Sequence, residues 1–354
     1  MPHWDGKMKV RFEAFDGLRG LASLVVVLGH FFDQGPVKNF PGLNLFTDTK
    51  VAVAIFFILS GFVLCQKKLP APPSGNPLNL LSRKVIARFV RLAVPVFGIS
   101  FLVFLMQPFI RPANDSTVYW NFFTEFYNFE RRSTDIVYYP LVDVFFLADF
   151  SRNYIPPSWT MRPEFICSIF IFLVPWSKLG QGSWKSVAFL FFVAALLIAT
   201  YGSLPFFYYL GFFIAGAAIR FLPAEIPYLL KFTILVVCLK TFCNYMGMRF
   251  FAFYFLFSLL LVLSIYQLKH MSAIFASSPF LFLGKISFPL YLIHVPLIAL
   301  IAPRLSDMAS ALQFESYGAL AFVFLIVMVS VLFVSWLLVV LDMVAIILSK
   351  KIKP

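Results

Sequence analysis

The fold is decided by the stretch AFDGLRGLASLVVVLGHFF, residues 14–32. Most of it is an apolar run, and about 20 mainly apolar residues are enough for one helix to cross a lipid bilayer. The run also contains an arginine, Arg19, and a histidine, His30. Ionisable side chains are costly inside a bilayer, so their presence in a membrane segment indicates a functional site.

Similar apolar runs recur along the whole chain of 354 residues. Hydrophobic residues make up 61% of it and charged residues only 13%, against about 45–50% and 25% in soluble domains. We therefore predict an all-α fold, a polytopic membrane helix bundle of about ten transmembrane helices that forms a single domain over residues 1–354. The predicted spans are 17–36, 50–66, 92–110, 163–179, 186–201, 206–222, 227–243, 249–268, 285–303 and 317–348.

The formal net charge of +13 comes largely from short basic clusters at the ends of apolar runs. Clusters such as 67–68, 83–91 and 350–353 fall on one side of the predicted membrane, and an excess of Lys and Arg marks the cytoplasmic side. We therefore expect a multi-pass protein of a plasma or inner membrane, with both termini cytoplasmic. Because the clusters do not form one basic surface, we expect no nucleic-acid partner.

Two segments fit no simple span. The loop 111–162 is the one sizeable hydrophilic segment on the predicted extracytoplasmic side. Within it, residues 140–150 are apolar but too short and too acidic to cross, and we expect them at the interface or in a re-entrant position. The four cysteines lie in apolar surroundings without metal-ligand spacing and are interpreted as packing residues, so we predict no metal site.

Arg19 and His30 are eleven residues apart, which places them on one face of a helix and about 16 Å apart along its axis. The alternative is that Arg19 extends to lipid headgroups while His30 makes one buried hydrogen bond. Asp16 directly precedes the predicted span and is followed by Gly17, a pattern typical of a helix N-cap.

The segment LSRKVIARFVRLAVP, residues 81–95, places Lys84, Arg88 and Arg91 on one face of a helix that we expect to end near Pro95. Arginines arranged in this way can bind the phosphates of a nucleotide-like carrier. They can equally bind anionic lipid headgroups, and their spacing does not decide between the two.

Two later segments add polar groups to apolar runs. In IPPSWTMRPEF, residues 155–165, Trp159 is expected at the interface. Glu164 either lies at the positive end of a helix dipole or orients or exchanges a proton with a histidine. In GKISFPLYLIHVPLI, residues 284–298, Tyr291 and His294 share a face, and His294 is either a structural residue or part of the site.

These motifs together resemble the acyltransferase-3 family of integral membrane acyltransferases. The resemblance rests on FDGLRGLASLVVVLGH, FFILSGFVL, RFVRLAVP, SWTMRPEF and SFPLYLIHVP, which occur in the family's order from residue 12 to about 300. Some members of that family carry a hydrolase-like domain after the membrane part. Here we expect a stand-alone membrane domain.

The resemblance implies O-acyl transfer, expected to be acetyl transfer, from cytosolic acyl-CoA to a hydroxyl of an extracytoplasmic or membrane-held glycan, glycolipid or small molecule. His30 and Glu164 are the expected catalytic residues, with His30 as general base or acyl acceptor. The expected donor-binding residues are Arg19, Arg88, Arg91, Asp16, Trp159, Tyr291 and His294. We expect no bound cofactor, acetyl-CoA or another acyl-CoA as donor substrate, and contacts with membrane lipids.

The pantetheine arm of the donor is expected to follow the Arg19–His30 face, because its reach is similar to the spacing of about 16 Å. The loop 111–162 is expected to help bind the acceptor. The alternative function is a proton-coupled or anion transporter whose pathway is lined by the same charged residues. We favour the enzyme because the motifs are ordered and no inverted repeat is visible.

Overall fold

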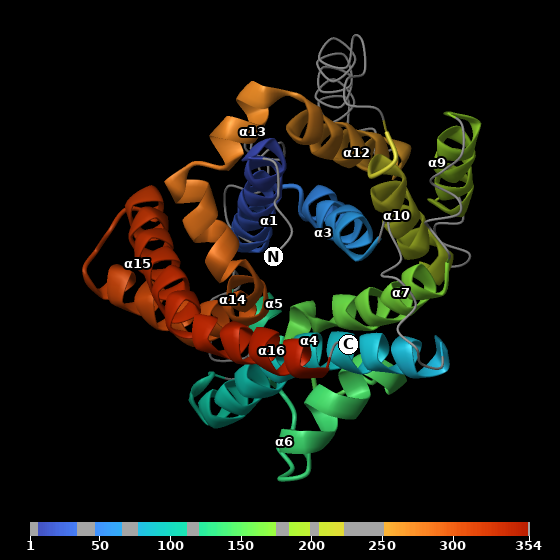
Figure 1. Ribbon diagram of the computed structural model, residues 1–354. Helices are drawn as coiled ribbons and strands as arrows, with labels where there is room; N and C mark the ends of the chain where they lie inside the picture. Colours follow the sequence, from blue (N-terminus) through green and yellow to red (C-terminus); the bar gives the residue numbers. More distant parts are fainter. Residues whose placement is uncertain are drawn as a thin grey trace.

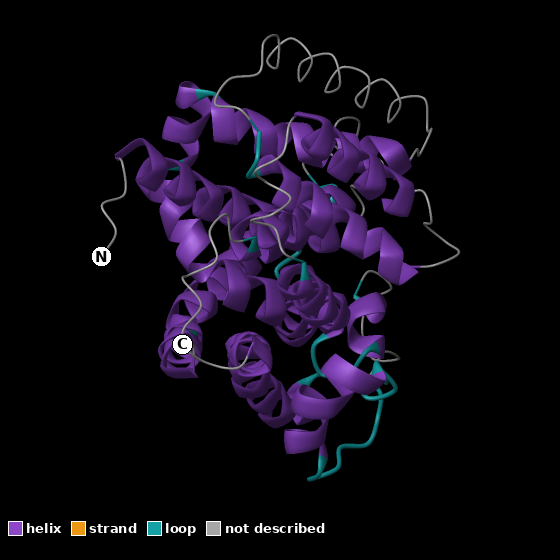
Figure 2. Ribbon diagram, turned by 45° about the vertical axis from the view of Figure 1, so that its right-hand side comes forward, coloured by secondary structure: helices purple, strands orange, loops and turns teal. Residues whose placement is uncertain are grey.

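A computed structural model describes residues 6–33, 47–65, 77–111, 120–174, 184–198, 205–222 and 251–352. In these residues the chain forms helices and loops, without a strand, as Figure 2 shows. The helices are apolar over most of their length. Four of them are long and apolar enough to cross a membrane, so the predicted all-α membrane bundle is confirmed.

Two helices lie in the middle of the bundle (Figure 1). These are α1 (Gly6–Asp33) and α3 (Thr49–Leu64). Around them lie five longer helices and one short one: α4 (Pro77–Met106), α7 (Met161–Leu173), α10 (Pro205–Ile219), α12 (Phe251–Gln267), α13 (Lys269–Phe275) and α14 (Ser278–Ala311). Polar side chains on α1 and α3 are therefore shielded from lipid by neighbouring helices.

The remaining helices extend this arrangement. On one side, α15 (Ser316–Leu337) packs on α14, and α16 (Val339–Ile352) packs on α4. On the other side, α9 (Trp184–Ile198) packs on α10. Short elements connect α4 with α7: η1 (Gln107–Phe109), α5 (Asn121–Glu125), α6 (Asp135–Tyr138), the π-helix η3 (Tyr139–Leu147) and η4 (Pro156–Thr160).

Helices occupy the predicted span ranges wherever the structure describes them, while the range 227–243 lies outside the described residues. The four helices that are long and apolar enough to cross a membrane are α1, α4, α14 and the continuous α15–α16 segment. The pair α12 and α13 would form a further span that is bent by 98°. The helices α3 and α10 are apolar but shorter.

Two predictions about helix ends are wrong. Asp16 is not an N-cap, because α1 begins at Gly6 and runs through it. The helix with the basic cluster does not end near Pro95, since α4 continues to Met106. Neighbouring helices at membrane depth allow a helix to continue through proline, and the cluster therefore belongs to the same helix as the third span.

The apolar segment near 140–150 forms the π-helix η3, which packs against α4 and α7. The Phe145 ring lies 5.1 Å from the ring of Phe89 and 6.0 Å from that of Phe165. The other face of η3 is exposed at Phe146 and Leu147. This segment thus covers the outer side of the helices that carry Arg88 and Glu164.

A close contact between α1 and α14 positions polar groups. A Cβ atom added to Gly20 would overlap the backbone of Leu283 and Gly284, and one added to Gly284 would overlap the backbone of Asp16. Small residues allow membrane helices to approach closely in this way. The close approach also allows the buried Ser23 hydroxyl to donate to the Ser287 carbonyl, at 3.0 Å.

Replacement of Gly20 or Gly284 by alanine should force α1 and α14 apart. We expect each variant to lose about 1–3 kcal/mol of stability, because neither backbone can yield to the added methyl group. The measurement is the thermal unfolding midpoint in detergent. Gly318→Ala in α15 is the matched control, since nothing lies within 4 Å of its added Cβ. Unchanged midpoints for Gly20→Ala and Gly284→Ala would contradict the close contact.

Candidate functional site

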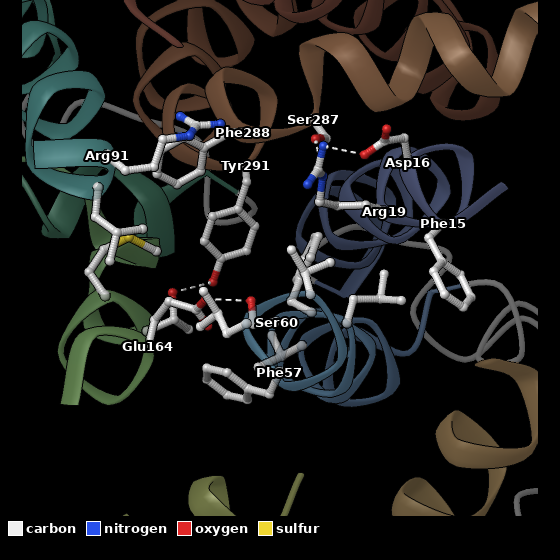
Figure 3. A pocket seen from close by; sticks show the side chains of 18 of the residues that line it. Phe15, Asp16, Arg19, Phe57, Ser60, Arg91, Glu164, Ser287, Phe288 and Tyr291 are labelled. Carbon is white, nitrogen blue, oxygen red and sulfur yellow. Dashed lines mark hydrogen bonds and ion pairs between the residues drawn. The ribbon is translucent and has the colours of Figure 1, made fainter. Parts of the chain in front are cut away.

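A pocket of about 360 Å³ opens among α1, α3, α4, α7, α14 and α16. Figure 3 shows its polar side chains, which come from helices far apart in the sequence. Three arginines line it: Arg19 from α1 and Arg88 and Arg91 from α4. The pocket therefore collects the basic residues that the sequence motifs had singled out separately.

The pocket follows α3 over its lining residues from Leu64 to Val53, a distance of about 16 Å along the helix. On α1 its lining stops at Arg19. Beyond that residue α1 packs on α14, where Ser23 meets Ser287. A long ligand would therefore follow α3 and not, as expected from the sequence, the Arg19–His30 face of α1.

Each of the three arginines is paired with a carboxylate. Arg19 donates from Nη2 to Asp16, at 2.8 Å. Arg88 donates to Glu164 across the α4–α7 contact. Ion pairs in a membrane bundle offset the high cost of isolated charges there. The pocket thus carries strong hydrogen-bonding groups while these pairs remain close to electrically neutral.

The third pair joins Arg91 to Asp342 of α16. Nη1 and Nη2 of Arg91 donate to the two carboxylate oxygens of Asp342. This two-point contact is the strongest geometry for such a pair. It ties the last helix of the chain to α4 at the wall of the pocket.

Glu164 is buried and lies next to Ser60, whose hydroxyl donates to the same carboxylate oxygen that accepts from Arg88. The sequence left open whether Glu164 lies at a helix start or contacts a histidine. The structure places it in the first turn of α7 and pairs it with Arg88 and Ser60 instead of with His30. Its direct electrostatic partner is therefore an arginine.

His30 contacts His294 across the α1–α14 contact. Nδ1 of His30 lies 2.8 Å from Nε2 of His294, and the two rings are nearly parallel. Nδ1 of His294 lies 3.2 Å from the Leu290 carbonyl oxygen. Neither histidine lines the pocket. The sequence placed the two residues on separate helices, and the structure joins them into one pair.

Tyr291 connects the pocket to the histidine pair. It lines the inner part of the pocket, and its ring lies 6.3 Å from the ring of His294. Its hydroxyl is 3.1 Å from the Thr160 hydroxyl. Tyr291 thus lies both at the wall of the pocket and next to His294.

Trp159 is placed apart from these groups. It does not line the pocket, the residue is 41% exposed, and its ring lies 5.9 Å from that of Tyr209. The neighbouring residue Thr160 lines the pocket instead. The donor-binding role expected for Trp159 therefore stays a prediction without a contact in the pocket to support it.

Sequence reasoning missed three polar residues of the site. Ser60 and Ser168 gave no signal, because serine is common in apolar helices and its partners lie on other helices. Asp342 did give one, since it is an acidic residue within the apolar run 317–348, and intramembrane carboxylates are functional candidates.

Comparison with known proteins yields one match. The acyltransferase-3 family model, described as an acyltransferase domain, matches residues 12–340. The comparisons with curated proteins and with solved structures found no match. The matched range includes every residue of the pocket except Asp342.

We expect the loss of one partner of the Arg88–Glu164 pair to destabilise the protein more than the replacement of both partners. Arg88→Met leaves the buried Glu164 carboxylate without its cation, and we expect a loss of about 3 kcal/mol. The double variant Arg88→Met/Glu164→Gln should regain most of that loss and remain inactive. Unfolding midpoints and activity are the measurements.

The control for this experiment is Arg111→Met. Arg111 pairs with Asp307 where both side chains are more than a third exposed, and such pairs contribute about 0–1 kcal/mol. Equal losses for Arg88→Met and Arg111→Met would contradict the importance of the buried pair.

Proposed function

Because the chain belongs to the acyltransferase-3 family of membrane acyltransferases, we propose that it transfers an acyl group, expected to be acetyl, from cytosolic acyl-CoA to a hydroxyl acceptor. The acceptor class is an extracytoplasmic or membrane-held glycan, glycolipid or small molecule. The protein is an integral membrane acyltransferase, and the proposal adds its donor, its acyl group and its acceptor.

The observation that carries the proposal is the pocket with three arginines that extends along α3 toward the histidine pair. Guanidinium groups bind phosphate through paired N–H donors. The inner part, with Val53, Phe56 and Tyr291, is mainly apolar and suits the thin pantetheine arm. Phosphates held near Arg19 and Arg88 would thus direct the arm along α3 and past Tyr291.

The hydrogen bonds of the neutral histidine pair support Nε2 of His30 as the proposed base. The Leu290 carbonyl can only accept, so Nδ1 of His294 carries a proton and Nε2 of His294 accepts. Nδ1 of His30 must then donate to His294. This leaves Nε2 of His30 with a lone pair, as a general base requires.

In the proposed reaction Nε2 of His30 takes the proton of the acceptor hydroxyl while the hydroxyl oxygen attacks the thioester carbonyl. The resulting tetrahedral intermediate breaks its C–S bond, and the departing thiolate takes the proton back from His30. In the covalent alternative Nε2 attacks the thioester carbonyl and expels the thiolate. The acceptor hydroxyl then attacks the acyl group and releases Nε2, and the thiolate takes the hydroxyl proton. Both routes need the same lone pair.

The direction of transfer follows from the basic clusters. We place the arginine end of the pocket on the cytosolic side of a plasma or inner membrane, with both termini cytoplasmic. The His30 end then lies nearer the extracytoplasmic side. Trp120, in the predicted extracytoplasmic loop 111–162, packs on Phe31 with ring centroids 5.4 Å apart. This contact supports a role for that loop in bringing the acceptor to His30.

Transfer of labelled acetyl from acetyl-CoA tests the proposed function. Membranes that contain the wild type should label a lipid or glycan fraction, whereas His30→Ala and Arg19→Ala should not at equal protein levels. The labelled fraction identifies the acceptor class. Equal labelling in all three membranes, or no labelling in any of them, would contradict the proposal and favour the alternative that the protein is a transporter.

If His294 orients His30, as we propose, substitutions of His294 should lower kcat by graded amounts. His294→Ala removes the acceptor for the Nδ1 proton of His30, and we expect kcat to fall about 100-fold while KM for acetyl-CoA is unchanged. His294→Gln keeps an acceptor oxygen and should retain more activity. His270→Ala, at an exposed site on α13, is the control. A kcat for His294→Ala equal to that of His270→Ala would refute this role.

A further inference from the structure

Arg19 and Arg88 are held by the same arrangement of groups, although they lie on different helices. Nε of Arg19 donates to the Ser287 hydroxyl at 3.2 Å, and Nη2 donates to Asp16. Nε of Arg88 donates to the Ser168 hydroxyl at 3.0 Å, and Nη2 donates to Glu164. In both cases a serine and a carboxylate accept hydrogen bonds from two of the three guanidinium nitrogens.

The two serines are themselves oriented by their helices. The Ser287 hydroxyl donates to the Gly284 carbonyl at 2.8 Å, and the Ser168 hydroxyl donates to the Glu164 carbonyl at 2.6 Å. Because each hydroxyl has one proton, its lone pairs must face the arginine. Both serines are buried, with at most 2% of their surface exposed. Each therefore acts as a fixed acceptor for Nε–H.

This arrangement leaves one terminal nitrogen of each guanidinium, Nη1, with both of its N–H groups available for a ligand. Nη1 of Arg19 and Nη1 of Arg88 make no hydrogen bond to a described residue, and both side chains line the pocket. The two cations are also close enough to interact electrostatically. An anion with two adjacent charged groups would offset this repulsion and accept from both Nη1 groups.

Arg91 differs, since both of its Nη atoms donate to Asp342. Both terminal nitrogens therefore take part in the contact between α4 and α16, and neither keeps both of its N–H groups for a ligand. The sequence assigned all three arginines to donor binding. In the structure, Arg19 and Arg88 have Nη1 available to a ligand, whereas Arg91 joins two helices.

We propose that Ser168 and Ser287 are positioning residues that hold Nη1 of Arg88 and Arg19 toward the diphosphate of the acyl-CoA donor. The inference rests on the proposed function, which supplies the donor class. It assigns the diphosphate to Arg19 and Arg88, and it excludes Arg91 from this subsite.

The test is the affinity of purified, detergent-solubilised protein for coenzyme A, measured by titration calorimetry. Ser168→Ala and Ser287→Ala should each weaken binding about tenfold, because Nε–H loses its acceptor and the guanidinium its orientation. Ser335→Ala is the matched control. Ser335 is fully buried in α15 and donates to the Val331 carbonyl at 2.6 Å without an arginine partner among the described residues, so its variant should bind like the wild type.

A second measurement separates positioning from a general loss of structure. S-acetylpantetheine lacks the diphosphate, so Ser168→Ala and Ser287→Ala should use it as donor as well as the wild type does, while KM for acetyl-CoA rises and kcat is unchanged. Weaker use of both donors, or coenzyme A affinities equal to that of Ser335→Ala, would overturn the role of the serines.

The outcomes also distinguish this inference from the proposed function. If Arg19→Ala and Arg88→Ala lose coenzyme A binding while both serine variants keep it, the donor pocket stands and the positioning role fails. If coenzyme A binds none of the proteins, both proposals fail. If phosphatidylglycerol added to nanodiscs displaces coenzyme A from the wild type, the arginines hold a lipid headgroup and both proposals fail as well.

Discussion

The close approach of α1 and α14 is the contact on which the site depends. Gly20 and Gly284 bring the two backbones together, since neither carries a side chain at the crossing. Along the same line of contact lie the Arg19–Ser287 bond and the His30–His294 pair. One packing interaction therefore positions both the expected phosphate-binding group and the expected base, and a small displacement would disturb both.

The second constraint is the cost of charge inside an apolar bundle. Arg19, Arg88 and Arg91 each pair with a carboxylate from within the pocket. Arginine suits this position because its planar fork can bind a carboxylate and still present further N–H groups. The pairs keep the guanidinium groups oriented, so the phosphates of an acyl-CoA would meet N–H groups that are already aligned.

The separation of pocket and histidines has a mechanistic consequence. The arginines line the pocket, whereas His30 and His294 lie beyond Tyr291. A donor in the pocket would approach the pair at Tyr291, which lines the pocket and whose ring neighbours that of His294.

The sequence by itself determined the membrane bundle, the range of most helices and the residues at which chemistry is expected. Long apolar runs predict helices because backbone groups in lipid must be bonded within their own segment, and Arg19, His30, Glu164 and His294 stood out because charge is rare there. Only the tertiary structure decided their partners. The pairs His30–His294, Arg88–Glu164 and Arg91–Asp342 join residues between 76 and 264 positions apart. Helix periodicity reports which face a residue occupies, but contacts between helices depend on packing across the whole bundle, which no local pattern encodes.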